Sequence, residues 1–221
     1  MGYSLGAIFP AAGWNLGVLG VVRNDDPSDA TFYAIDLTAA GAVGPAKISF
    51  EGALGTGEMG DTDLSGLMAY LGAFMPAGAV NVGVELAYSR GNDPDTAENE
   101  GFLFHDYQGP FNSFILFNNF DLDGYVSNFA GDAGVVNALA LKASASFAAT
   151  KQLSFMAAGV WAQADEAAGD DDMGIEVDAL AKYAVNENLT LQAGLGYLFV
   201  GDYFGDVDDP MVVTAQAVVA F

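Results

Sequence analysis

The last eleven residues, Met211 to Phe221, read MVVTAQAVVAF. In a β-strand, successive side chains point to opposite faces. One face of this stretch would then carry only Met, Val, Ala and Phe, while the other carries Thr214 and Gln216. Chain ends usually fray in water. The stretch therefore predicts a terminal strand that faces an apolar environment and has partners along both of its edges.

The composition is unusual for a water-soluble domain. Of 221 residues, 52% are hydrophobic and 16% are charged, yet the formal net charge is −23. So acidic a chain is a poor partner for nucleic acid, because binding phosphates requires clustered Lys and Arg. The absence of cysteine excludes disulfides and thiolate metal sites. No run approaches the ~20 apolar residues of a membrane helix, and no sequence feature indicates a cofactor.

The alternation seen at the C-terminus recurs along the whole chain. The repeating segments have about the 9–11 residues that a tilted strand needs to cross a bilayer. The predicted strands lie near residues 14–23, 30–40, 45–54, 64–75, 79–90, 135–149, 153–164, 173–184, 189–199 and 210–221.

The connections between these strands alternate in length and charge. Short ones include Gly41–Pro45, Pro76–Ala79 and Val185–Asn188, and the others are longer and acidic. Of the 29 Asp and Glu residues, 23 fall in the longer set. An up-and-down antiparallel sheet places alternate connections at opposite ends. One end is therefore predicted to be tight and the other long-looped and negative, as in transmembrane β-barrels.

Each predicted strand has a more apolar and a more polar face, and its charged residues fall on the polar face, except Arg90 at the end of its strand. Those on the polar faces are Arg23, Asp36, Lys47, Glu51, Glu85, Lys142, Glu176, Asp178 and Lys182. Two architectures fit this sorting. In a soluble sandwich or barrel the apolar faces pack inward, whereas in a membrane barrel they meet lipid and the charged faces line the lumen.

Aromatic residues on the apolar faces favour the membrane barrel, because they concentrate at two levels. Toward the short turns the sorting places Trp14, Phe74, Phe147, Phe155, Tyr183 and Phe221. Toward the long loops it places Tyr33, Tyr88, Trp161, Tyr197 and Phe199. Tyr and Trp suit a membrane interface because each ring is apolar at one end and polar at the other. We therefore predict an all-β, transmembrane, up-and-down antiparallel barrel with about 10–12 strands in this chain.

The chain resembles Gram-negative outer-membrane β-barrels of the porin type along nearly all of its length. The terminal strand, with Val219 behind Phe221, is similar to the C-terminal signal that outer-membrane assembly machinery recognises. The resemblance implies contact with outer-membrane lipid and lipopolysaccharide, extracellular loops and a periplasmic C-terminus. It also implies that Phe221 lies in the periplasmic aromatic girdle, on a strand paired on both sides.

The N-terminal segment leaves two domain organisations open. Tyr3–Phe9 alternates like an eleventh strand, and Pro10–Gly13 resembles a short turn. Residues 1–9 are either an irregular lead-in to one barrel over residues 1–221 or a strand in the C-terminal part of a larger, export-type porin. Even strand counts in bacterial barrels favour the second reading.

Few residues suggest chemistry. The only histidine, His105, lies beside Asp106 and could serve a hydrolase at the barrel rim, although a lone His in an aromatic loop is more often structural. No second His is available for a conventional metal site. The acidic clusters at Asp121 and Asp123 and at Asp170, Asp171 and Asp172 could bind cations weakly through carboxylates. None of them has the spacing of a calcium loop, so solvated loops are the simpler interpretation.

The stretch from residue 91 to 134 is the most informative loop. It contains the phenylalanines Phe111, Phe114, Phe117 and Phe120, three residues apart. Burying one Phe is worth roughly 1.5–3 kcal/mol, so this area would not be left in water. We expect the loop, with His105, to fold into the lumen as a constriction or plug. An outward extension of two strands and a contact with a neighbouring subunit are the alternatives.

Three functions fit these features. The first is a porin for passive diffusion of small hydrophilic solutes or ions, with an acidic extracellular mouth that favours cations. The second is a non-conducting structural barrel that holds a protein partner in its lumen or at its loops. The third is a rim hydrolase that uses His105. The near balance of positive and negative charges on the polar faces indicates a weak ion filter, and pairing across neighbouring strands is the simpler role for those charges.

Overall fold

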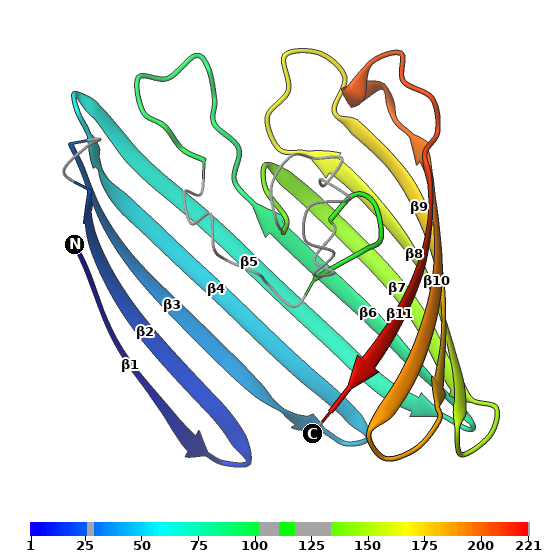
Figure 1. Cartoon of the computed structure of the whole chain (residues 1–221). Coiled ribbons are helices and arrows are strands. Elements are labelled where there is room, and N and C mark those ends of the chain that lie inside the picture. Colours follow the sequence, from blue (N-terminus) through cyan, green and yellow to red (C-terminus); the bar gives the residue numbers. More distant parts are fainter. Residues whose placement is uncertain (26–28, 102–110, 118–133, 221) are drawn as a thin grey trace.

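The computed structural model describes residues 1–25, 29–101, 111–117 and 134–220. Eleven strands form one sheet in the described residues, and Figure 1 shows that the sheet is strongly curved. The strands are β1 (Gly2–Ala11), β2 (Trp14–Asp25), β3 (Ala30–Val43), β4 (Ala46–Met59), β5 (Thr62–Ala77), β6 (Val80–Ser89), β7 (Ala138–Ala148), β8 (Leu153–Ala164), β9 (Asp172–Ala184), β10 (Leu189–Val200) and β11 (Met211–Val219). A short 3-10 helix, η2 (Asp202–Phe204), lies between β10 and β11.

The strand order in the sheet follows the order in the chain, and all neighbouring strands are antiparallel. The tight turns use residues with positive φ, among them Gly13 (84°), Gly44 (59°) and Gly78 (68°). Glycine adopts such angles without a steric cost. The fold is therefore the predicted up-and-down antiparallel arrangement, with short turns at one end and the longest connections at the other (Figure 1).

All ten predicted strands are present, and residues 2–11 form an additional strand rather than an irregular lead-in. The prediction of a long acidic connection after residue 54 is wrong. Strands β4 and β5 extend to Met59 and from Thr62, so only Gly60 and Asp61 join them. Gly60 has φ of 59°, which permits this tight reversal.

The two edge strands each have one neighbour in the described part of the chain: β1 pairs with β2, and β11 pairs with β10. The expectation that the last strand is paired on both sides is therefore not met within these residues. Both edge strands also run in the same direction, from the long-loop end to the short-turn end, because ten antiparallel pairings separate them. Direct pairing of β1 with β11 would be parallel.

The two faces of the sheet differ as strand alternation requires. On the convex face, large apolar side chains are exposed, such as Val84 (53%), Ile175 (51%) and Leu195 (44%). The neighbouring concave positions include Glu85 and Glu176, which are 4% and 0% exposed. Residues 111–117 lie on the concave side and cover these positions (Figure 1). Apolar side chains thus face outward, and most of the buried core lies between the sheet and this segment.

The assignment of Phe74 to the convex aromatic set is wrong. Phe74 is paired in register with Lys47 and with Gly83, which are concave positions. Its ring lies so close to Gly83 that a Cβ there would be 2.6 Å from Phe74 Cδ1. Sorting by the more apolar side fails for β5 because both of its faces are apolar. Phe147 and Phe155, by contrast, are exposed and in ring contact at 5.5 Å.

In the described residues, no helix has the length and apolar character needed to cross a membrane.

A matched pair of lysine substitutions tests which face meets lipid. Ala143 in β7 is on the convex face, and the adjacent Ser144 is on the concave face. We expect Ala143→Lys to lower the free energy of unfolding by about 2–4 kcal/mol, the cost of a lysine facing lipid near the bilayer midplane. Ser144→Lys should cost much less. Urea unfolding from lipid vesicles measures both, and equal costs would contradict the assignment.

Candidate functional site: residues 111–117 on the concave face

The register places all nine charged residues predicted for the lumen on the concave face. Four of them, Glu85, Lys142, Glu176 and Asp178, are buried beneath residues 111–117. The other five lie on concave positions that are half-buried or exposed: Arg23, Asp36, Lys47, Glu51 and Lys182. The structure thus separates a covered group, on β6 to β9, from an uncovered group, most of which lies on β2 to β4.

Residues 111–117 form a compact turn organised by Ser113. The Ser113 backbone N–H donates to the Phe117 carbonyl oxygen at 2.9 Å. The Phe117 backbone N–H in turn donates to Ser113 Oγ, also at 2.9 Å. Both residues are nearly inaccessible to solvent. The serine therefore satisfies backbone groups that the turn buries, as buried polar groups require.

The Glu176 carboxylate binds this turn to the sheet. It accepts hydrogen bonds from Ser113 Oγ at 2.8 Å, from the Ile115 N–H at 2.7 Å and from the Leu116 N–H at 2.8 Å. Strand β9 holds Glu176 at a concave position where it has no exposure to solvent. Hydrogen bonds to a charged group contribute about 1.5–3 kcal/mol each, more than neutral ones. Glu176 is therefore the main polar attachment of the segment.

Lys142 provides a second polar attachment. Its Nζ donates to the Asn112 carbonyl oxygen at 2.9 Å and lies 3.1 Å from Glu85 Oε2. Glu85 also accepts a hydrogen bond from the Tyr70 hydroxyl at 3.1 Å. The Lys142 ammonium is 5.7 Å from the centre of the Phe111 ring, within the range of a cation–π contact. Lys142 and Glu85 are directly opposed on β7 and β6, so this pair is an ion pair across neighbouring strands.

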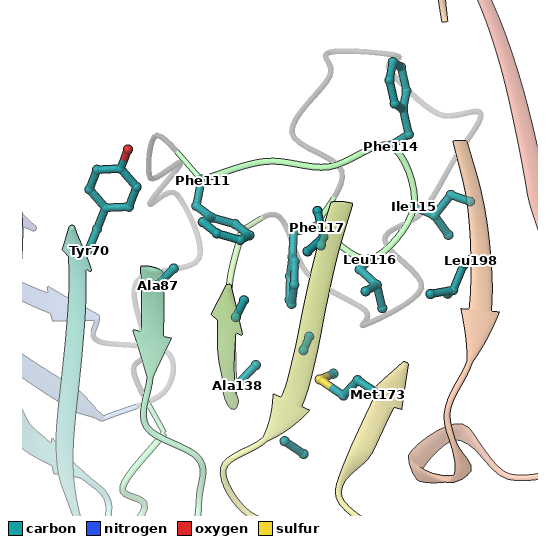
Figure 2. Packing of buried hydrophobic residues seen from close by; sticks show 14 of the residues in the cluster. Tyr70, Ala87, Phe111, Phe114, Ile115, Leu116, Phe117, Ala138, Met173 and Leu198 are labelled. Carbon is teal, nitrogen blue, oxygen red and sulfur yellow. The ribbon is translucent and has the colours of Figure 1, made fainter. Parts of the chain in front are cut away.

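The apolar side chains of the segment pack against small residues of the sheet. Phe111 and Phe117 meet edge to face with ring centres 5.7 Å apart. Figure 2 shows these rings above the strands that carry Ala87 and Ala138, with Leu116 between Phe117 and Leu198. Large side chains on the segment thus face alanines on the wall, which leaves room for the segment inside the curve of the sheet.

Two glycines of β10 make room for Phe114. A Cβ at Gly194 would lie 2.5 Å from Phe114 Cζ, and one at Gly196 would lie 2.6 Å from Phe114 Cβ. Real Cβ atoms do not approach other atoms this closely, so any larger residue at either position would displace Phe114. Glycine in a strand often marks such a close approach.

The acidic connections at the long-loop end hold one another by hydrogen bonds. Asn137 donates from Nδ2 to the Glu166 carbonyl oxygen at 2.9 Å and accepts from the Glu166 N–H at 2.8 Å. The Gly91 N–H donates to Asp165 Oδ2 at 2.8 Å. Arg90 forms an ion pair with Glu100. Beyond these contacts, exposed carboxylates crowd this end: Asp95, Glu98, Asp170, Asp171, Asp172, Asp202, Asp206, Asp208 and Asp209.

Several predicted site residues lie outside the described residues: His105, Phe120, Asp121, Asp123 and Phe221. Val219, the last residue of β11, is described and is 59% exposed. The roles predicted for all of them stay predictions.

The acidic run at 170–172 is largely engaged with its own loop. Asp170 accepts from the Asp172 N–H, Asp172 accepts from the Gly174 N–H, and Asp171 accepts from Gln163. Within the described part of the chain, no group of three Asp, Glu or His side chains could hold a metal ion. Weak cation binding at this run stays a prediction.

Sequence reasoning did not identify the roles of Ser113, Gly194 and Gly196. Each left a signal. Ser113 is the hydroxyl residue inside the apolar run FNSFILF, and the glycines share the parity of the polar face of β10. Strand parity alone does not show which segment crosses above them.

Comparisons with known proteins identify the fold through structure alone. No family model matches the chain, and no curated protein matches its sequence. Among solved structures, Pseudomonas aeruginosa OccK3 matches with a TM-score of 0.62 and 13% identity, over 98% of this chain and 57% of that chain. Salmonella typhi OmpF, solved in complex with daunomycin, matches with a TM-score of 0.58 and 13% identity, over 97% and 61%.

A BenF-like porin from Pseudomonas fluorescens is also similar, with a TM-score of 0.56 and 11% identity, over 99% of this chain and 56% of that chain. The chain thus spans between 56% and 61% of the length of these three proteins. The residues described here have the fold of the porin-type outer-membrane β-barrels.

Proposed function

We propose that the protein is a channel of the outer membrane for passive diffusion of small hydrophilic solutes or ions. The observation that carries the proposal is the sorting of the two faces: apolar side chains are exposed on the convex face, and the nine charged residues predicted for the lumen all lie on the concave face. Glu58 and Asp63, which have convex positions, lie at the long-loop ends of β4 and β5. A barrel wall sorted in this way meets lipid outside and water inside. The porin fold supports the same reading.

In the proposed orientation the acidic connections are extracellular, in contact with lipopolysaccharide, and the C-terminus is periplasmic. Val219 and Phe221 would be read by the assembly machinery. The exposed carboxylates would then surround the channel mouth and raise the local concentration of cations.

We expect a modest cation preference in a planar bilayer at low salt. The preference should fall between about 0.1 M and 1 M salt, because the Debye length shortens from ~10 Å to ~3 Å. Changing Asp206, Asp208 and Asp209 to Asn should reduce the preference, whereas Glu187→Gln in the opposite, short-turn end should not. Reversal potentials measure both, and anion selectivity at low salt would contradict the proposal.

We further propose that residues 111–117 constrict the channel. They lie against the concave face rather than outside it, and Glu176 and Lys142 attach them there. In this position the segment reduces the cross-section available to solutes. A segment held by a few polar contacts can also be released by removing one of them.

Glu176→Gln should release the segment and raise single-channel conductance. Glutamine offers one acceptor oxygen where three donors converge and adds a donor of its own, so we expect a loss of about 3 kcal/mol. Gly194→Val should act similarly by displacing Phe114. Glu187→Gln is the matched control for the change of charge. Unchanged conductance in both variants, with protease access to the segment also unchanged, would contradict the constriction.

A conducting channel needs both edges of the sheet to be paired. We propose that the barrel is larger than these eleven strands. Two observations support this reading: β1 and β11 run in the same direction, and eleven is odd, whereas bacterial single-chain barrels have even strand numbers. An odd number of further strands would close the barrel with antiparallel pairs only.

Introduced cysteines test this closure, since the chain has none of its own. Leu5→Cys with Gly20→Cys, directly opposed on β1 and β2, should form a disulfide and serves as the control. Leu5→Cys with a cysteine at Val213, Ala215 or Ala217 on β11 should not. A disulfide between β1 and β11 in the membrane-inserted chain would show direct, parallel closure instead.

One observation favours a non-conducting barrel as the second candidate. Residues 111–117 cover the concave face of β5 to β10 so well that Leu116 and Phe117 have no exposure. A barrel filled in this way could serve as a scaffold that binds a protein partner at its loops. Absence of conductance in wild type and in Glu176→Gln would favour this candidate. Neither candidate assigns catalysis to His105, and His105→Ala tests the rim hydrolase.

A further inference from the structure

The concave face of β1 to β4 contains a hollow of about 670 Å³. It lies away from residues 111–117, which cover the opposite half of the sheet. Its size is within the ~300–1,000 Å³ typical of sites for small organic ligands.

The walls of the hollow are apolar, which is unusual for the inner face of an outer-membrane barrel. Ile8 and Leu19 occupy concave positions and are 83% and 39% exposed. Val21, Ala34 and Ala53 extend the same surface. Gly6 and Gly17 lie between them and contribute backbone only. An apolar patch does not assist the passage of water and ions along a channel wall. It is better suited to contact with the apolar part of a ligand.

Two carboxylates face the same hollow. Asp36 on β3 and Glu51 on β4 both line it, and they are diagonal neighbours on the same face, because Glu51 is opposite Thr38. Neither forms an ion pair within the described residues. Arg23 and Lys47 point to the same face but lie farther along the strands. Arg23 is four residues along β2 from Leu19, which is opposite Asp36, and Lys47 is four residues from Glu51 on β4, roughly 13 Å in each case. The hollow therefore has a concentrated negative charge that no cation of the described chain neutralises.

We propose that this hollow binds amphiphilic organic cations, with an apolar body against Ile8, Leu19 and Val21 and an ammonium group at Asp36 and Glu51. Apolar walls with a few placed polar groups are the usual design of small-molecule sites. A positively charged group would supply what the carboxylate pair lacks, and it would donate charge-assisted hydrogen bonds to both. Binding of this kind does not require conduction, so the inference stands apart from the channel function.

The test uses the full chain in a non-ionic detergent and three probes of one shape. They are the cation 1-naphthylmethylammonium, the neutral 1-naphthylmethanol and the anion 1-naphthoate. Naphthyl fluorescence with equilibrium dialysis measures binding, and protein-free micelles give the partition background. We expect saturable binding of the cation, at least about tenfold tighter than the neutral probe, and no saturable binding of the anion.

Two kinds of variant separate the contribution of the carboxylates to binding from that of the apolar walls. Asp36→Asn with Glu51→Gln keeps the shape of the site and should abolish the preference for the cation, leaving the neutral probe unaffected. Val21→Trp should fill the hollow and weaken both probes. Glu187→Gln, which removes one carboxylate charge at a short turn, should bind like wild type. A heat-modifiable band on electrophoresis shows that each variant is folded.

Three results would overturn the inference: no saturable binding of the cation, equal affinity for all three probes, or a cation preference that survives Asp36→Asn with Glu51→Gln. The last would place the ligand at another carboxylate. Conductance of the same preparations is measured separately. A conducting protein that fails to bind the probe overturns this inference alone, and a binding protein that fails to conduct overturns the channel alone.

Discussion

The alternation of side chains along paired strands is the constraint on which the rest of this structure depends. In lipid, backbone N–H and C=O groups find no water, so a spanning chain must pair them between strands. The side chains then divide by parity, and the chain places Val84 and Ile175 on one face and Glu85 and Glu176 on the other. Apart from Glu58 and Asp63 at the long-loop ends of β4 and β5, the charges of the strands follow this division. A folded segment can therefore be attached to the concave face by charged groups that do not reach the convex side.

The attachment of residues 111–117 illustrates how a barrel wall and its contents are matched. The wall contributes small residues and two opposite charges, while the segment contributes large rings and backbone N–H donors. Glu176 accepts hydrogen bonds from backbone N–H groups of the turn, and Lys142 donates one to the Asn112 carbonyl oxygen. Alanines and the glycines at 194 and 196 leave the space that the rings occupy. Charge, hydrogen bonding and volume are thus complementary at the same place.

Most of the fold could be predicted from the sequence because strand parity is a local property. The strands, their order and the concave position of the nine charged residues predicted for the lumen all follow from alternation and turn residues. The prediction failed where a local pattern was ambiguous. Phe74 lies in a strand that is apolar on both faces, and the connection after β4 contains alternating residues that extend the strands. The attachment through Glu176 depends on contacts 60 or more residues apart, which no local pattern reports.

The common direction of β1 and β11 limits how this sheet can associate with itself. Copies inserted with their loops on the same side of the membrane all present edge strands that point the same way. Any contact between such edges, whether β1 with β11 or β1 with β1, is a parallel pairing, which is slightly weaker per residue than an antiparallel one. An antiparallel contact between two copies would need one of them upside down, with its acidic loops carried across the bilayer. Insertion in one orientation therefore restricts any edge that further strands do not cover to parallel contacts with other copies.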